Sequence, residues 1–168
     1  DLDLITTAPS VRYRITTTQL AAATEDRFSD GSGSGAITMP HEEVRDYFYQ
    51  RQNYLHELDT AAEDLTARMR MHRGDLRREL SVRLTEVHGV RIVKRIDMGD
   101  TVLHRFAPTT RMLEISTELS TGQQVFRMAA ELAYLEVGGL IEEMVTDGRF
   151  TSEESRRLAR LGFANYFA

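Results

Sequence analysis

The stretch FRMAAELAYLE, residues 126–136, decides the fold of this chain. Apolar side chains occur on nearly every side of this stretch, a pattern typical of a helix buried at the centre of a domain. Ser120 and Gln123 have the spacing of a capping box, which predicts that the helix begins there. Gly138-Gly139 interrupts the pattern and Asp147-Gly148 ends it. The sequence therefore predicts one central, buried helix.

Three further helices surround this one in the sequence. Pro40 favours a helix start, and apolar residues at helical spacing predict one long helix over residues 40–73. Asp75 caps a second helix, which ends at Gly89. Thr151 and Glu154 predict the start of a last helix, which runs to Tyr166.

The residues between Gly89 and Ser120 alternate between apolar and polar. Short runs over residues 90–96, 102–106 and 112–116, separated by turns, predict a three-stranded antiparallel meander. Lys94 shares a face with Val90 and Ile92, so its side chain is expected to point toward the core. The predicted class is α+β, a mainly helical domain with a three-stranded antiparallel meander.

The length of 168 residues fits one main domain. We expect residues 1–35 to form a connecting helix and a flexible linker, with the glycine- and serine-rich stretch 29–35 as the linker. The domain itself would span residues 36–168. Since the helical pattern still runs at Ala168, we expect a domain that is truncated at its C-terminal end.

Composition narrows the possible functions. The chain has no cysteine, which excludes disulfides, thiolate zinc sites and iron–sulfur clusters. Its net charge of −5 predicts that it does not grip DNA itself, because such surfaces are basic. No apolar run reaches the roughly 20 residues of a membrane span, and no signal peptide is apparent. We expect a cytoplasmic protein without membrane contact.

The predicted order of elements resembles that of small zinc metallopeptidases, a zincin-like arrangement. Those enzymes carry His-Glu-x-x-His on the buried helix, with two zinc ligands and a general base. The matching stretch here is AELAY, residues 130–134, which keeps only Glu131. Ala130 cannot bind zinc and Tyr134 is a poor ligand. The sequence thus predicts a degenerate metal site, no metal and no enzymatic activity.

Three separated segments resemble the PrpR/RamB family of regulators, and the PrpR branch most: residues 126–136, LARLGFANYFA at 158–168, and DYFYQRQNYL at 46–55. The resemblance covers roughly residues 12–168. It implies an ImmA/IrrE-like domain in a regulator of propionate and short-chain fatty acid metabolism, including the methylcitrate cycle. It further implies coenzyme A or a short-chain acyl-CoA as effector, promoter DNA bound through a separate helix-turn-helix domain, and a homodimer. No cofactor is expected in this chain.

A CoA site needs positive charge for phosphates and a slot for the pantetheine arm. The basic candidates on the predicted strands are Arg91, Lys94, Arg95 and Arg105. An inward Lys94 would pair with a ligand phosphate or with Glu131, or else extend to solvent. Arg51 on the long helix is a further candidate, with a salt bridge to Glu131 or Glu136 as its alternative.

The remaining candidates are Tyr134, Glu131 and Tyr47. Tyr134 would line the vacated cleft or pack in the core, and Glu131 would order the site or neutralise a basic partner. Tyr47 belongs to an aromatic group that would flank an adenine or, more often, form core; His104 is expected to be a core histidine. Two other functions stay open: a dimerisation domain that uses the aromatic edge of the helix over residues 40–73, and a hydrolase.

Overall fold

The computed structural model describes residues 39–69, 76–96, 98 and 102–168. Its helices and strands confirm a mainly helical α+β domain. The predicted helix and linker within residues 1–35 and the predicted cap Asp75 lie outside the described residues. The elements are α2 (Pro40–Gln50), α3 (His56–Met69), α4 (Leu76–Val82), the π-helix η1 (Arg83–Val87), β1 (Arg91–Arg95), β2 (His104–Ala107), β3 (Met112–Ser116), α5 (Thr121–Asp147) and α6 (Glu153–Phe167).

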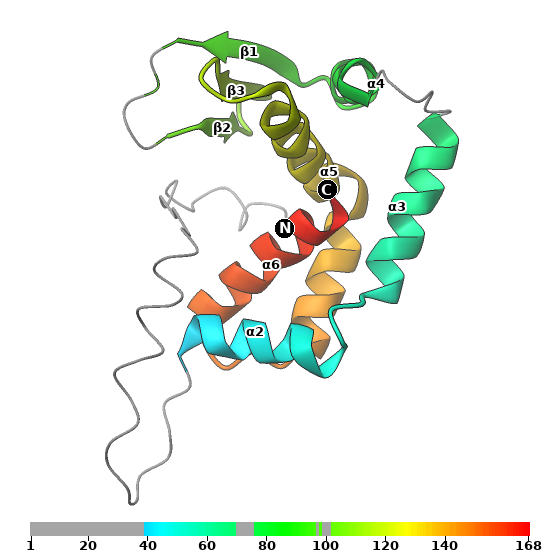
Figure 1. Ribbon diagram of the computed structural model, residues 1–168, viewed down its shortest axis with the longest axis vertical. Coiled ribbons are helices and arrows are strands. Elements are labelled where there is room, and N and C mark those ends of the chain that lie inside the picture. The colour runs from blue at the N-terminus through cyan, green and yellow to red at the C-terminus, as the bar shows by residue number, and fades with distance from the viewer. Residues whose placement is uncertain (1–38, 70–75, 97, 99–101) are drawn as a thin grey trace, which may run out of the picture.

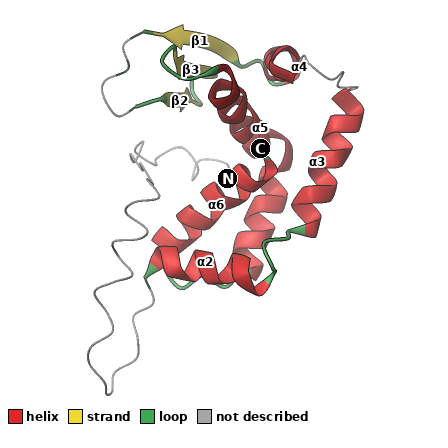
Figure 2. Ribbon diagram, in the orientation of Figure 1, coloured by secondary structure: helices red, strands yellow, loops and turns green. Residues whose placement is uncertain are grey.

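The long helix α5 organises the molecule. Figure 1 shows the small sheet at one end, α2 at the other, and α5 running between them. The colouring by secondary structure in Figure 2 shows that, within the described part of the chain, helices make up everything except the sheet end and the short connections. Ser120 caps α5 as predicted: its Oγ accepts from Gln123 N, and the Gln123 side chain accepts from Ser120 N at 2.9 Å.

Two hydrophobic clusters meet along α5. The first joins α2, α6 and the C-terminal part of α5, with Leu58 and Phe163 fully buried. The second joins α4, η1 and the sheet to the N-terminal part of α5, with Leu84 and Leu113 fully buried. Helix α3 takes part in both clusters, and Phe167 packs against both. The two clusters are therefore connected by shared elements.

The predicted single helix over residues 40–73 is wrong. The chain leaves the helix after Gln50 and starts α3 at His56. Gln52 and Asn53 adopt positive φ angles of 54° and 57°, a conformation that ends helices. The amide of Leu55 then donates to the Tyr166 hydroxyl at 3.2 Å. The apolar spacing continued across this break, so periodicity alone did not reveal it.

The predicted antiparallel meander is also wrong in its topology. The strand order is β1-β3-β2, with β1 parallel to β3 and β2 antiparallel to β3. The sheet is therefore mixed, and the last strand in the sequence lies in its centre. Alternation located all three strands, but it carries no information about which strands pair.

Lys94 does not point into the core as predicted. Along β1, exposure increases from buried Val90 through half-buried Ile92 to exposed Lys94, and Ile96 is 82% exposed. Since β1 is an edge strand, its far end leaves the hydrophobic cluster. A smaller correction concerns α6, whose cap is Ser152 rather than Thr151. Thr151 instead binds Glu43 through its backbone amide at 2.8 Å.

Candidate functional site

The peptidase-like stretch lies on α5, in the half that packs against the sheet. Ala130 is buried, the Glu131 side chain is 15% exposed, and Tyr134 is 38% exposed. Positions 130 and 134 are one helical turn apart and share a face, but neither side chain is a good zinc ligand. Among the described residues, no group of three or more His, Cys, Asp or Glu could hold a metal ion.

Glu131 faces His104 of β2, with 3.7 Å between Glu131 Oε1 and His104 Nε2. This distance is too long for a hydrogen bond. Burial raises the pKa of Glu131 to about 7, while the charge of Arg127 opposes that rise. Burial, helped by Arg127, lowers the pKa of His104 to about 4. Between these two values both side chains are neutral, with the proton on the carboxyl group.

Tyr134 lies one turn beyond Glu131 on the same helix. Partial burial raises its pKa to about 12, and the charge of Glu131 contributes to that rise. Its hydroxyl is therefore protonated throughout the neutral range. Besides Glu131, the charges that act on this hydroxyl are those of Arg160 on α6 and Glu142 on α5.

The register of the sheet places Lys94 and His104 on the face that carries Ile115. Lys94 pairs with Ile115 in β1–β3, and His104 pairs with Ile115 in β2–β3. Paired residues point to the same side, so the three form a row across the sheet. Two strand spacings, roughly 10 Å, separate the ends of this row. One end is an exposed cation and the other is the half-buried histidine beside Glu131.

The other three basic candidates, Arg91, Arg95 and Arg105, do not lie on the face that carries Ile115. On the opposite face Glu114 is buried, and it accepts hydrogen bonds from Arg95 Nε at 2.9 Å and from Arg105 Nε at 2.9 Å. These bonds lower the pKa of Glu114, with Arg105 as the larger cause. Arg91 is exposed and its Nη2 lies 3.6 Å from Met112 Sδ. The structure does not bring these arginines together with Glu131.

Arg51 and Tyr47 contact each other far from the peptidase-like stretch. The Arg51 guanidinium lies 3.6 Å from the centre of the Tyr47 ring, a cation–π contact. Tyr47 is buried with Phe150 and Phe163 in the first hydrophobic cluster, so the interpretation of Tyr47 as core is the better one. The alternative salt bridge from Arg51 to Glu131 or Glu136 is wrong.

Glu136 has different partners on η1 and the residue after it. Its Oε1 accepts from Arg83 Nε at 2.6 Å and lies 2.7 Å from His88 Nε2. The hydrogen bond from Arg83 is the main cause of its lowered pKa. The contacts of Glu136 with Arg83 and His88 therefore link α5 to η1 and the residue that follows it.

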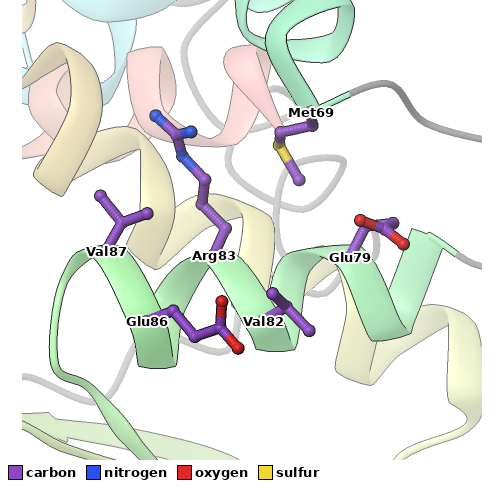
Figure 3. Close-up of a pocket in the computed structure, with 6 residues that line it drawn as sticks. All are labelled: Met69, Glu79, Val82, Arg83, Glu86 and Val87. Atoms are coloured by element: carbon purple, nitrogen blue, oxygen red, sulfur yellow. The ribbon is translucent and has the colours of Figure 1, made fainter.

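Two pockets lie on the surface of the helices. One, of about 410 Å³, is lined by Glu142, Glu143, Thr146 and Asp147, and its charge disfavours phosphates. The other, of about 170 Å³, is lined by Met69, Glu79, Val82, Arg83, Glu86 and Val87. Figure 3 shows Arg83 rising between Val87 and Met69 in this pocket. It is smaller than the roughly 300 Å³ that ligand pockets usually exceed. Neither pocket contains a predicted site residue.

Sequence reasoning did not include Arg127 in the site and treated His104 as core. In the structure, the charge of Arg127 lowers the pKa of Glu131, and His104 Nε2 lies 3.7 Å from Glu131 Oε1. The signal for Arg127 was present, because a residue four positions before Glu131 lies on the same helix face. The position of His104 depends on the pairing of β2 with β3, which the sequence pattern did not give.

A helix with a glutamate but without zinc ligands, packed on a small mixed sheet, defines a degenerate member of a peptidase-like class. The chain belongs to the IrrE N-terminal-like domain family, whose model matches residues 85–168. This finding confirms the predicted ImmA/IrrE-like fold.

The comparison with individual proteins identifies the type of regulator. The chain is 82% identical over 157 residues to the HTH-type transcriptional regulator RamB of Mycobacterium tuberculosis, covering 94% of this chain and 33% of that protein. It is 38% identical to PrpR of the same organism, over 89% of this chain and 32% of PrpR. The PrpR/RamB resemblance is confirmed, but the expectation that PrpR is the nearer of the two is wrong.

One more regulator and one solved structure are also similar to this chain. A propionyl-CoA carboxylase regulator of Cereibacter sphaeroides is 32% identical, over 77% of this chain and 26% of that protein. A solved structure of a Mycobacterium tuberculosis transcriptional regulator matches with a TM-score of 0.72 and 40% identity, over 77% of this chain and 39% of that one. The chain spans about a third of the length of the RamB and PrpR relatives.

Proposed function

We propose that this chain is the ligand-sensing domain of a transcription regulator of propionate or other short-chain fatty acid metabolism, with a short-chain acyl-CoA as effector. The observation that carries the proposal is a peptidase-like helix without zinc ligands in a chain 82% identical to a transcriptional regulator. The name of a relative, a propionyl-CoA carboxylase regulator, supports the chemical class of the effector.

The proposed site lies between α5 and the inner face of the sheet. Lys94, at the exposed end of the row with Ile115, would bind a phosphate of CoA. Glu131 and Tyr134 would contact the acyl end. The proposed site does not require the other predicted ligand contacts. These contacts, which stay predictions, are those of Arg91, Arg95, Arg105, Arg51 and Tyr47.

The regulator would act in the cytoplasm as a homodimer and bind promoter DNA through a separate helix-turn-helix domain. None of the described helices is long and apolar enough to cross a membrane.

Calorimetry with propionyl-CoA, acetyl-CoA and free CoA tests the proposal. We expect saturable binding and a rise in the unfolding temperature, because a ligand that binds only the native state stabilises it. Lys94→Ala should weaken binding, since it removes a phosphate contact, whereas Arg149→Ala on the loop before α6 should not. Absence of binding and of thermal shift at millimolar acyl-CoA would contradict the proposal.

A dimerisation domain is the second candidate. Tyr49 is 63% exposed and Tyr54 is 52% exposed around the break between α2 and α3, and exposed aromatic side chains often mark protein contacts. A dimer in sedimentation that Tyr49→Ser dissociates, in a chain without acyl-CoA binding, would favour this candidate.

A further inference from the structure

Strand β1 has an outer edge that no other strand covers in the described part of the chain. The order β1-β3-β2 places β3 on its inner side only, as Figure 1 shows. The amide of Arg91 donates to the Arg111 carbonyl at 2.8 Å, and the Arg95 carbonyl accepts a bond from the residue after β3. In a parallel pair, alternate residues of a strand bond to its neighbour. The backbone N–H and C=O groups of Ile92 and Lys94 therefore point to the outer edge.

The side chains along β1 make this edge locally positive. Arg91 and Lys94 are exposed, and among the described residues neither forms an ion pair with a carboxylate. Arg95, whose side chain is 51% exposed, shares the carboxylate of Glu114 with Arg105. Four cations thus lie beside one carboxylate, in a chain whose net charge is −5. An acidic partner is the one that this part of the sheet attracts.

The side chains also define a pattern that an added strand would meet, because they alternate between the two faces of the sheet. The face toward the core carries Ile92, Lys94 and Ile96, and Ile96 is a large apolar residue that is almost fully exposed. Arg91 and Arg95 lie on the opposite face. An added strand would therefore meet one cation between two apolar side chains on one face, and two cations on the other.

A second copy of β1 does not suit this edge. Two such strands placed edge to edge would bring the cations of both copies together, and like charges on neighbouring strands destabilise the pair. A lysine on an edge strand is a common safeguard against self-association. A strand that carries carboxylates is instead stabilised by the same charges, so the edge discriminates between the two occupants.

We propose that the outer edge of β1 binds an extended acidic peptide segment as a fourth strand. The segment would pair antiparallel, the more stable arrangement, with carboxylates opposite the cations of β1 and apolar side chains opposite Ile92 and Ile96. Backbone hydrogen bonds to Ile92 and Lys94 supply affinity, and the side chains supply selectivity. This inference does not rest on the proposed function, which uses the Lys94 side chain and not the strand edge.

The probe is the acetylated and amidated hexapeptide valine-glutamate-glutamate-threonine-valine-glutamate, whose residues fall in order opposite positions 96 to 91. In titration calorimetry we expect saturable binding that weakens as salt is added, because exposed charges are screened. The same peptide with lysine in place of each glutamate should bind about tenfold more weakly or less, since its charges are repelled. Hydrogen exchange of the Ile92 and Lys94 amides should slow in the complex.

Two substitutions of Lys94 separate the backbone contribution from the charge. Lys94→Ala removes the charge and should weaken peptide binding about threefold, the size of an exposed ion pair. Lys94→Pro also removes the outward N–H and should weaken binding about tenfold further, the size of one hydrogen bond. Proline is tolerated on an edge strand where the N–H faces solvent. Ile96→Glu, which adds a repelling charge at an exposed position, should also weaken binding and tests the proposal even where Lys94→Pro unfolds.

Arg68→Ala, which removes an exposed cation on α3, is the matched control and should bind the peptide like the parent. Circular dichroism of each variant establishes that it is folded. The inference is overturned if the acidic peptide does not bind at millimolar concentration, if the lysine peptide binds equally well, or if the Ile92 and Lys94 amides stay unprotected in the complex. Self-association of the chain that Lys94→Pro abolishes in sedimentation would assign the edge to a second copy and overturn it as well.

Discussion

At the scale of single residues, Glu131 and His104 reverse their usual order of protonation. An isolated histidine titrates above an isolated glutamate, yet here the carboxyl group has the higher pKa. Burial causes both shifts, because it disfavours the charged form of each group. Burial raises the pKa of an acid and lowers the pKa of a base, so the neutral pair is the stable state at mildly acidic pH.

This pair predicts how stability depends on pH. Glu131 keeps its proton in the folded chain up to a pKa of about 7, whereas in the unfolded chain it ionises near its ordinary value. The folded state therefore loses stability as the pH rises between these values and no further above them. Glu131→Gln removes this loss. We expect its free energy of unfolding, relative to the parent, to increase by about 2.5 kcal/mol from pH 5 to pH 8.

Urea denaturation of both chains at a series of pH values checks this expectation. The opposite contribution of His104, whose native pKa is about 4, reduces stability as the pH falls below its ordinary value. It is common to both chains and cancels in the difference. A difference that does not change with pH would show that Glu131 is ionised in the folded state at pH 5.

The residues of the site could be predicted only in part. Glu131 and Tyr134 followed from helical spacing within one segment, which fixes a face without knowledge of the rest. Lys94 was assigned to the correct face of its strand, but its exposure depends on where β1 leaves the hydrophobic cluster. The opposite placement of Arg95 and Arg105 depends on their shared contact with Glu114, which spans three strands.

At the scale of elements, α5 contains a kink that its glycines explain only in part. Val137 leaves helical geometry, with φ −127° and ψ 20°, just before Gly138 and Gly139. A Cβ atom added at either glycine would meet nothing within 4 Å, and neither glycine has a positive φ. Both positions thus have space for a side chain in a helical backbone. The kink is located at Val137, which packs against the first hydrophobic cluster.

Two glycine substitutions should therefore have opposite effects. Gly139→Ala should raise the free energy of unfolding by roughly 0.5–1 kcal/mol, because alanine favours the helix. Gly89→Ala should lower it by roughly 1–2 kcal/mol, since Gly89 has a φ of 63° that alanine adopts only with strain. Denaturant melts measure both. A destabilised Gly139→Ala would mean that the kink requires glycine there.

The elements themselves were more predictable than their connections. Caps and breakers are local signals, so the starts of α2 and α5 and the end at Gly89 followed from a few residues each. The break after Gln50 did not, because Gln52 and Asn53 adopt positive φ angles that their residue types do not dictate, and the chain after them is held by the bond from Leu55 N to the Tyr166 hydroxyl of α6. The parallel pairing of β1 with β3 is likewise a long-range choice.

At the scale of the whole molecule, shared elements should make unfolding cooperative. Helices α3 and α5 supply residues to both hydrophobic clusters, and Glu136 ties α5 to Arg83 and His88. Loss of one cluster therefore removes the partners of the other. The class of fold could be predicted from the sequence because it depends on the order of elements, but this shared packing could not.

Truncation in either cluster tests this cooperativity. Leu84→Ala in the second cluster and Leu58→Ala in the first should each lower the free energy of unfolding by about 2–5 kcal/mol, because both side chains are fully buried. Each variant should still unfold in one transition, seen equally by far-ultraviolet circular dichroism and tyrosine fluorescence. Two separated transitions would show that the clusters are independent units.

The order of the strands has a consequence for how the chain acquires its structure during synthesis. β3 lies between β1 and β2, so neither of the two earlier strands has a partner until Ser116 has left the ribosome. The sheet cannot grow hairpin by hairpin from its N-terminal side. Chains emerge at roughly 5–20 residues per second, so β1 and β2 spend an interval with unpaired edges. A ribosome pause before β3 is the moment at which this domain would be most dependent on a chaperone.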